Sequence, residues 1–487
     1  MATAAKTKLI DLFNPKHDTV PSTLVWANAW RLDASAFLPE DNSVSISVAK
    51  SSGKALSDIA EVFTVYIQTP ILQYVAPFAH SLPYLTTSEL GEYQCGESSH
   101  VSLLSDPRLI EWRIKRNTVV LSRSGRVGEA YWVDKKLADA LVGDSFRIVP
   151  RNKEDAFFLY ALLASPYARN YVSGITYGSV VNHASVEQVR SLPVPDISVH
   201  NRAQISDLVR KAVLARESAY DLLQAADEAM LRANALGVLG SLKLVTFDPL
   251  GQPACFPVDA KKVQEANGDG SELRLDAHFY NPTAQQALVD IRNCGSEVKT
   301  VADVTERAFF CNRFTRTFVD KEHGIPYLAG KNIVQVRPTD IAYLSRSQTI
   351  DLDQYRLRKG WILMTCSGTI ARTCLVWKNF EEFVGTHDLI RIVPNASRMD
   401  GGYLYSFLSS DYGTAQVLRY RHGSVIDHVT PEQVQRVLVP CPPPKQQTAI
   451  GDKVREAYEN RAEAIRLEDE AQAILIKFTK APRTRGE

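Results

Sequence analysis

The sequence predicts an α+β protein: two pseudo-symmetric α+β domains separated by two long antiparallel coiled-coil helices. Three observations give this prediction. The chain has 487 residues, and a single hydrophobic core rarely grows beyond about 250–300 residues. Its second half repeats its first half. Each copy also runs through strand-like and helical segments and then enters a long heptad pattern.

Short motifs mark the duplication. The sequence Arg-Leu-Asp-Ala at 31–34 recurs at 274–277, an offset of 243 residues. Further along, residues 157–195 match residues 402–440 at 15 of 39 positions, far more than chance gives. This period is too long for a solenoid, and each copy is large enough to fold as its own domain.

Within each copy, strand-like runs precede helical ones. The predicted elements are strands at 118–121 and 146–150 and a helix at 156–167 in the first copy, and strands at 361–365 and 389–394 and a helix at 402–412 in the second. A Gly-Ser pair then opens a loop at 178 and at 423. Capping-box sequences beginning at Ser185 and Thr430 predict a short helix after each loop.

A long heptad helix follows each domain. Apolar residues recur at strict 3-4 spacing through five heptads after 205, while the second series has two polar interruptions. The residues expected to pair the helices are Ile205, Leu208, Ala212, Leu222, Ala457, Ala464, Leu467 and Ile474. A heptad seam needs a partner helix, so we expect the two helices to pack against each other, antiparallel. The alternative is that each helix packs only on its own domain.

These features divide the chain into seven parts. They are an N-terminal segment (1–21), a first domain (22–198), a first spacer helix (199–236), a connector (237–272), a second domain (273–444), a second spacer helix (445–480) and a tail (481–487). The connector is rich in Gly and Pro, as expected for a link between domains.

The composition excludes several classes of protein. Apolar residues make up 45% and charged residues 23% of the chain, as in an ordinary globular protein. No apolar run is long enough for a membrane span, and the N-terminus lacks a secretory signal, so we expect a cytoplasmic protein. The seven cysteines form no Cys-x-x-Cys pair, which argues against a disulfide framework or a zinc ribbon.

Motifs for catalysis are also missing. The sequence has no Gly-rich phosphate loop, no Gly-x-Ser-x-Gly nucleophile elbow and no His-Glu-x-x-His zinc motif. The adjacent pair His387-Asp388 has no matching nucleophile motif. We therefore predict a non-catalytic chain with no metal and no cofactor of its own.

Net charge is uninformative, since 56 Lys and Arg face 55 Asp and Glu. Local basic patches are the relevant feature. Residues 106–126 hold six basic side chains against two acidic ones. The second copy carries Arg313, Arg316, Lys331, Arg337 and Arg346, and later the run Arg419-Tyr420-Arg421-His422. Such residues suit contacts with phosphates and base edges, although a solvated charged face is the plainer interpretation.

The ordered motifs of the second copy carry a resemblance. They are Gly-Trp-Ile-Leu at 360–363, Ser-Gly-Thr-Ile at 367–370, His-Asp-Leu-Ile-Arg-Ile at 387–392, Gly-Ser-Val-Ile at 423–426 and the stretch 437–450 with Pro-Pro-Pro-Lys-Gln-Gln. In this order they resemble the specificity (S) subunits of type I restriction–modification enzymes. The resemblance covers roughly residues 22–478. The first copy matches more loosely, because it lacks the Pro-Pro-x-x-Gln-Gln stretch.

The resemblance implies a function. Each domain would be a target recognition domain that reads one half of a bipartite double-stranded DNA target. The paired helices would act as a ruler and as a dock for DNA methyltransferase (M) subunits, which bind S-adenosylmethionine, and a restriction/translocase (R) subunit can join them. The system would be ordinary restriction–modification or another methylation-linked phage defence. A scaffold whose duplicated domains bind only protein is the rival interpretation.

DNA contacts are expected in the Gly-Ser loops and the Ser-Gly turns. The candidates are Arg123, Arg126, Tyr177, Ser179, Asn182 and His183 in the first copy, and Thr369, Arg372, Arg421, His422, Ser424, Asp427 and His428 in the second. His183 and His428 are identical in both copies, so they cannot distinguish different half-sites. We interpret them as loop braces or phosphate contacts.

Overall fold

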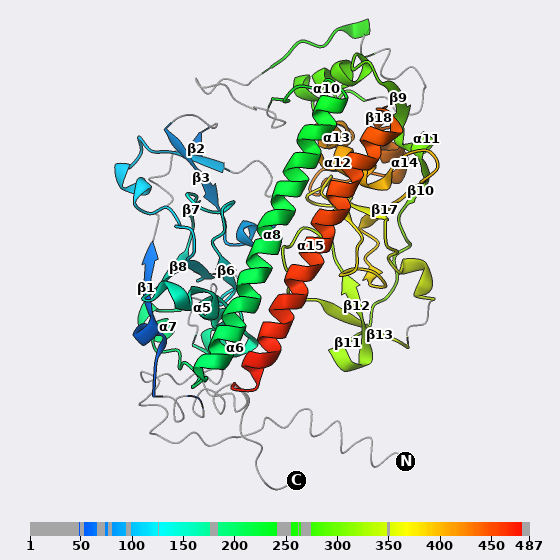
Figure 1. The fold of residues 1–487 in the computed structure, drawn as a ribbon. Helices are drawn as coiled ribbons and strands as arrows, with labels where there is room; N and C mark the ends of the chain where they lie inside the picture. The colour runs from blue at the N-terminus through cyan, green and yellow to red at the C-terminus, as the bar shows by residue number, and fades with distance from the viewer. Residues whose placement is uncertain are drawn as a thin grey trace.

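The protein forms two α+β lobes on either side of a pair of long helices that cross the whole molecule (Figure 1). The computed structural model describes residues 48, 53–65, 74–75, 80–93, 99–124, 126–175, 184–240, 255–261, 263, 274–347 and 351–479. The first copy builds one lobe and the second copy builds the other. The fold class predicted from the sequence is confirmed.

The first lobe holds two four-stranded sheets. The larger is antiparallel, with the order β1 (Ala60–Val65), β8 (Ser145–Pro150), β5 (Val119–Ser122) and β6 (Ala130–Trp132). The smaller has the order β2 (Tyr74–Val75), β4 (Ser99–Ser102), β3 (Ser81–Leu85) and β7 (Leu141–Val142). Every residue of β5 is buried, as expected for a mostly apolar strand at the centre of a sheet.

The second lobe repeats both sheets strand for strand. Its larger sheet has the order β10 (Thr305–Phe309), β17 (Leu389–Pro394), β14 (Ile362–Thr365) and β15 (Thr373–Leu375). Its smaller sheet has the order β11 (Phe318–Val319), β13 (Ala342–Ser345), β12 (Gly324–Leu328) and β16 (Val384–Gly385). The sequence duplication is therefore a duplication of topology.

Each predicted domain helix is in fact two helices. They are α5 (Ala156–Leu163) and α6 (Pro166–Gly174) in the first lobe, and α12 (Gly401–Ser409) and α13 (Asp411–Leu418) in the second. The break falls at a serine N-cap, where Ser165 or Ser410 accepts a backbone N–H of the next helix. The short helices α7 (Val186–Arg190) and α14 (Pro431–Gln435) begin at the predicted capping boxes.

Further elements complete the lobes. They include α4 (Leu56–Ile59), α10 (Pro282–Arg292), α11 (Val301–Val304) and the two-stranded sheet of β9 (Glu297–Thr300) and β18 (Leu438–Cys441). No helix in the described ranges has the length and apolar character needed to cross a membrane.

The long helices α8 (Val199–Ala233) and α15 (Pro444–Ile476) pack side by side and run in opposite directions, as predicted (Figure 1). Near their middle, Asn460 Nδ2 donates to Ser218 Oγ at 3.2 Å. Of the eight residues predicted for the seam, Ile205, Leu208, Ala212, Ala457, Ala464 and Leu467 are buried, and Leu222 and Ile474 are half-buried.

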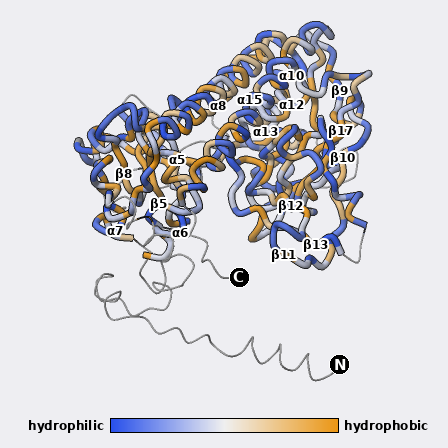
Figure 2. The backbone as a smooth tube through the Cα atoms, turned by 60° about the horizontal axis from the view of Figure 1, so that its bottom comes forward, coloured by the Kyte–Doolittle hydropathy of each residue, from blue (hydrophilic) through white to orange (hydrophobic). Residues whose placement is uncertain are grey.

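Both helices also pack on their own lobes. A Cβ on Gly402 of α12 would lie 2.7 Å from the Cα of Gly451 on α15, so the two helices touch through their backbones. The buried face of α15 is accordingly wider than an a/d seam and includes Val454 and Tyr458. Pairing and packing on the lobe, which the sequence argument treated as alternatives, occur together. Figure 2 shows the two lobes flanking this helix pair, with hydrophobic segments inside each.

A buried ion network sits where the helices cross the interface between the lobes. Glu468 of α15 is 5% exposed. It accepts from Arg216 of α8 at 2.5 Å, from Arg337 of the second lobe at 3.2 Å and from the Tyr160 hydroxyl at 3.3 Å. Burial raises the pKa of Glu468, but the positive charges of the two arginines outweigh it, so the pKa lies below its usual value.

Candidate nucleic-acid interface

The 421–428 loop joins α13 to α14 in the second lobe. It closes on itself through two backbone hydrogen bonds, from His422 N to His428 O (3.0 Å) and from His428 N to His422 O (2.7 Å). Gly423 has a φ of 118°, and a Cβ there would lie 2.1 Å from the carbonyl oxygen of Ile426. Only glycine fits this position, so the Gly-Ser motif fixes a tight, preformed turn.

The loop docks on the Ser-Gly turn that follows β14. Gly368 N donates to Asp427 O at 3.0 Å, and Val429 N donates to Cys366 O at 3.1 Å. Thr369 is exposed beside them. The two segments of the second copy that the sequence proposed separately as DNA contacts therefore form one continuous surface.

The loop presents polar and apolar groups together. Arg421 Nε lies 3.5 Å from Asp427 Oδ1, and both side chains are about one-third exposed. His422 and Ser424 are exposed. At the tip, Val425 is 93% exposed and Ile426 is 52% exposed. A short basic segment with an apolar tip suits base edges, where thymine methyl groups lie beside hydrogen-bonding atoms.

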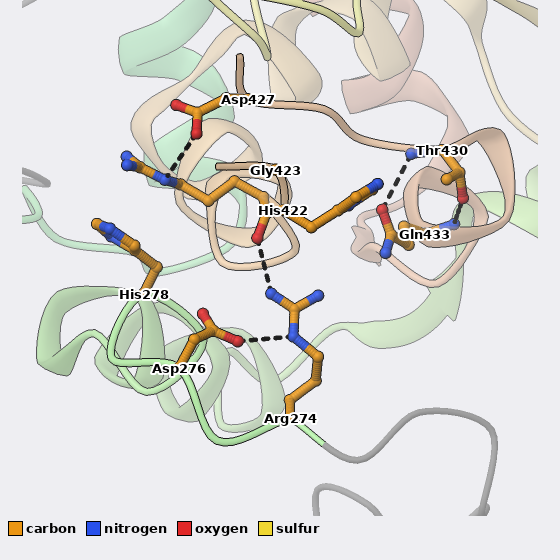
Figure 3. Close-up of a pocket in the computed structure, with 9 residues that line it drawn as sticks. Arg274, Asp276, His278, His422, Gly423, Asp427, Thr430 and Gln433 are labelled. Atoms are coloured by element: carbon orange, nitrogen blue, oxygen red, sulfur yellow. Dashed lines mark hydrogen bonds and ion pairs between the residues drawn. The ribbon is translucent and has the colours of Figure 1, made fainter. Parts of the chain in front are cut away.

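A cavity of about 670 Å³ opens beneath the loop. It is lined by Arg274, Asp276, His278, Arg421, His422, Gly423, Asp427, Thr430 and Gln433. Figure 3 shows that Arg274 and Asp276 face the loop from the segment that precedes α10. Burial and the positive charge of Arg421 lower the pKa of His278 below its usual value. The cavity is thus lined with both hydrogen-bond donors and hydrogen-bond acceptors.

The structure does not bring all the sequence candidates to this surface. Arg372 forms an ion pair with Glu92 of the first lobe. Arg126 donates to Thr339 of the second lobe at 3.3 Å. Both arginines therefore lie between the lobes and hold them together. Arg123 forms an ion pair with Asp144 at 2.9 Å. The candidates Tyr177, Ser179, Asn182 and His183 lie outside the described residues.

The basic patch of the first copy is largely neutralised. Its arginines form ion pairs with carboxylates: Arg108 with Asp106 (2.7 Å), Arg113 with Asp139 (3.2 Å) and Arg116 with Glu217 (2.8 Å). Charges paired in this way attract a distant polyanion only weakly. The structure therefore gives this patch less net positive charge than a count of its basic residues suggests.

The segment after β10 offers cations that the sequence noted but did not place. Arg313 and Arg316 are exposed, and Arg316 Nη1 donates to the Tyr327 hydroxyl at 3.0 Å. Burial first, and then the charges of Arg313 and Arg316, lower the pKa of His387. The neighbouring Asp388 carbonyl accepts from Cys366 N at 3.4 Å. These arginines thus lie close enough to His387 for their charges to act on it, a proximity that depends on strand pairing and not on local sequence.

Comparison with known proteins gives structural matches only. No protein-family model matches the sequence, and a search of curated proteins returns no match. The chain aligns structurally with S subunits of type I restriction–modification systems. One, from M. genitalium, has a TM-score of 0.32 and 10% identity over 88% of this chain and 96% of that chain.

Two further solved structures align over similar lengths. The HsdS subunit from Thermoanaerobacter tengcongensis has a TM-score of 0.27 and 14% identity over 88% of this chain and 96% of its own. A chain from a study of assembly and conformational transition of the type I system has a TM-score of 0.27 and 15% identity, over 88% and 97%.

Proposed function

We propose that this protein is the DNA sequence-specificity subunit of a type I-like restriction–modification or methylation-linked phage-defence complex. One observation carries the proposal: two α+β lobes of identical topology sit on either side of an antiparallel helix pair. A molecule of this kind presents the same type of surface twice at a fixed separation. That is what a bipartite DNA target requires.

The dimensions support this geometry. Helix α8 has 35 residues and α15 has 33, which at about 1.5 Å per residue makes each about 50 Å long. Half-sites read from one face of B-DNA lie roughly 34–36 Å apart, one helical turn. The residues 22–198 and 273–444 are the proposed recognition domains, with 199–236 and 445–480 as the spacer helices.

The residues proposed to contact DNA are those of the surface in the second lobe. They are Thr369, Arg421, His422, Ser424, Asp427 and His428, with Arg313 and Arg316 as phosphate contacts. Thr369, His422 and Ser424 are exposed. In the first copy we propose Tyr177, Ser179, Asn182 and His183, the equivalents of His422, Ser424, Asp427 and His428, from the sequence repeat alone.

The partners follow from the resemblance of the sequence motifs to S subunits. The chain would dock DNA methyltransferase (M) subunits, which supply S-adenosylmethionine chemistry, and an R subunit can complete the complex. This chain would carry out no chemistry itself. Purification from the native host should recover a methyltransferase, while methylation of DNA by the purified chain alone would contradict the assignment.

Salt dependence separates this proposal from the rival scaffold. A protein that neutralises phosphates releases counterions, so its affinity for duplex DNA falls steeply with salt. Fluorescence anisotropy with labelled random duplexes at about 50 and 200 mM salt measures this. A loss of affinity of tenfold or more supports DNA binding. Absence of binding at the lower salt concentration favours the protein scaffold.

A further inference from the structure

The first residue of the repeated Arg-Leu-Asp-Ala motif contacts the start of the 421–428 loop in the second lobe. Arg274, the first residue of the motif in the second copy, donates from Nη1 to the Tyr420 carbonyl at 3.2 Å and from Nη2 to the Arg421 carbonyl at 2.7 Å. Its side chain is 12% exposed. Figure 3 shows the guanidinium of Arg274 directed at the strand of chain that leads into Gly423.

Both carbonyls lie just beyond helix α13, which ends at Leu418. They therefore belong to the segment that links the helix to the loop and not to the hydrogen-bond ladder of the helix. A cation at that end also interacts favourably with the helix dipole. Because the guanidinium has two parallel N–H groups, it binds two successive carbonyls at once and fixes the direction in which the chain leaves the helix.

Arg274 is itself held in place. Asp276, two residues later, accepts from Arg274 Nε at 2.7 Å and from Phe279 N at 3.0 Å. Partial burial acts to raise the pKa of Asp276, but these hydrogen bonds and the charge of Arg274 outweigh it and lower the pKa below its usual value. The ring of Phe279 packs edge-on against Tyr420, 5.8 Å between centroids. Motif, ring and helix end therefore form one rigid unit.

We propose, resting on the function proposed above, that Arg274 is a positioning residue for DNA recognition. It does not touch DNA. It sets where the 421–428 loop begins and so where Arg421, His422 and the apolar tip meet the bases. The same four residues occur at 31–34 in the first copy, which predicts the same role for Arg31 in the other half-site.

The test measures preference at each half-site separately. The full chain, purified with its methyltransferase partners, is equilibrated with duplexes in which one half-site or the other is randomised. In Arg274→Ala and Arg274→Lys, preference should fall by tenfold or more at one half-site and stay within twofold at the other. Arg31→Ala should reverse the pattern. Lysine keeps the charge but cannot bind both carbonyls.

Controls separate positioning from folding. Arg398 also donates to a backbone carbonyl in the second lobe, to Asp303 at 3.1 Å, but on an exposed turn away from the loop. Arg398→Ala should leave both half-site preferences unchanged. If thermal unfolding shows that Arg274→Ala destabilises the protein, the binding results of Arg274→Lys are used to test the proposal instead. Equal loss at both half-sites, or no loss at either, overturns the positioning role. Failure of the wild-type complex to bind any duplex overturns the proposed function instead.

Discussion

Glu92 and Gln335 occupy equivalent positions in the two copies, 243 residues apart, and they pair with each other. Tyr93 N donates to Val334 O at 2.8 Å, and Val336 N donates to Gly91 O at 2.7 Å. These two hydrogen bonds are related by the repeat, because Tyr93 is equivalent to Val336 and Gly91 is equivalent to Val334. The pseudo-twofold axis of the molecule therefore passes between Glu92 and Gln335.

This pairing ties the lobes together independently of the helices. Beside it, Glu92 forms an ion pair with Arg372, and Thr339 of the second lobe donates to Glu129 of the first at 3.1 Å. The separation of the two proposed reading surfaces is thus set at two places, along the helix pair and across this bridge. Because the lobes are joined both along the helix pair and at the Glu92–Gln335 bridge, rotation of one lobe against the other is restricted.

Cysteines at the bridge should crosslink within one chain. Because the flanking residues carry the hydrogen bonds, Glu92 and Gln335 form a non-hydrogen-bonded pair, for which the Cα atoms lie about 4.5 Å apart. That separation is compatible with a disulfide. Glu92→Cys with Gln335→Cys should give an intramolecular 92–335 disulfide on mild oxidation, detected by peptide mass spectrometry. The Gln335→Cys single variant controls for pairing with Cys95, and crosslinks found only between chains would contradict the arrangement.

The alanine seam should not tolerate larger side chains. Ala464 is fully buried between α15, α8 and the first lobe. Ala464→Leu should lower the free energy of unfolding by about 1–3 kcal/mol, because added methylene groups overpack the seam. Ala473→Leu, at an exposed position of the same helix, should change it by less than about 0.5 kcal/mol. Equal effects of the two substitutions in urea unfolding would argue against a close-packed helix pair.

Glu468 should make stability depend on acid pH. Its folded pKa is lowered, so its contribution is present above the unfolded value of about 4.3 and is lost as the pH falls through the folded pKa. Glu468→Gln leaves the buried Arg216 without its anion, while Arg337 keeps its ion pair with Asp469. Because Arg216 is then a buried, uncompensated charge, the change should cost about 3–5 kcal/mol at pH 7.

The difference between Glu468→Gln and wild type should shrink below about pH 4, because there the unfolded chain takes up a proton at Glu468 more readily than the folded protein does. Thermal unfolding at pH 7 and pH 3.5 measures it. Glu470→Gln, on an exposed ion pair with Arg466, should cost less than about 1 kcal/mol at either pH. A Glu468→Gln deficit that is the same at both pH values would show that the buried carboxylate is not the source.

Much of the fold follows from local sequence signals. The duplication, the central strands and the long helices α8 and α15 can all be recognised in the sequence. The capping residues Ser185 and Thr430 likewise mark the starts of the short helices α7 and α14. The breaks at Ser165 and Ser410 were missed, although a serine before Pro166 is a start signal for a new helix.

The site was less predictable because its charges pair across long sequence distances. Arg116 forms an ion pair with Glu217, 101 residues later, and Arg372 forms one with Glu92 in the other copy. A count of nearby basic residues cannot detect such partners. The sequence identified the Gly423-Ser424 loop but gave no sign that Arg274 supports it, since that contact exists only once the domain has folded.

Arg421 should contribute either to specificity or to charge neutralisation. A bidentate arginine on guanine discriminates by roughly 1–3 kcal/mol, whereas a phosphate contact weakens all sequences alike when removed. Arg421→Ala should therefore relax one base position of one half-site, or reduce the salt slope by about one unit. Binding to targets mutated base by base at two salt concentrations distinguishes these results. If both the preference and the slope stay as in wild type, the loop does not touch DNA.

The central claim is that one chain reads two half-sites at a fixed spacing. Selection of bound duplexes from a random library, using the full chain with its co-purifying methyltransferase subunits, tests it most directly. The enriched sequences should contain two constant half-sites with an unspecified spacer of constant length, and inserting one base pair into that spacer should remove the preference. Enrichment of a single continuous site, tolerance of any spacer length, or no enrichment would contradict the account.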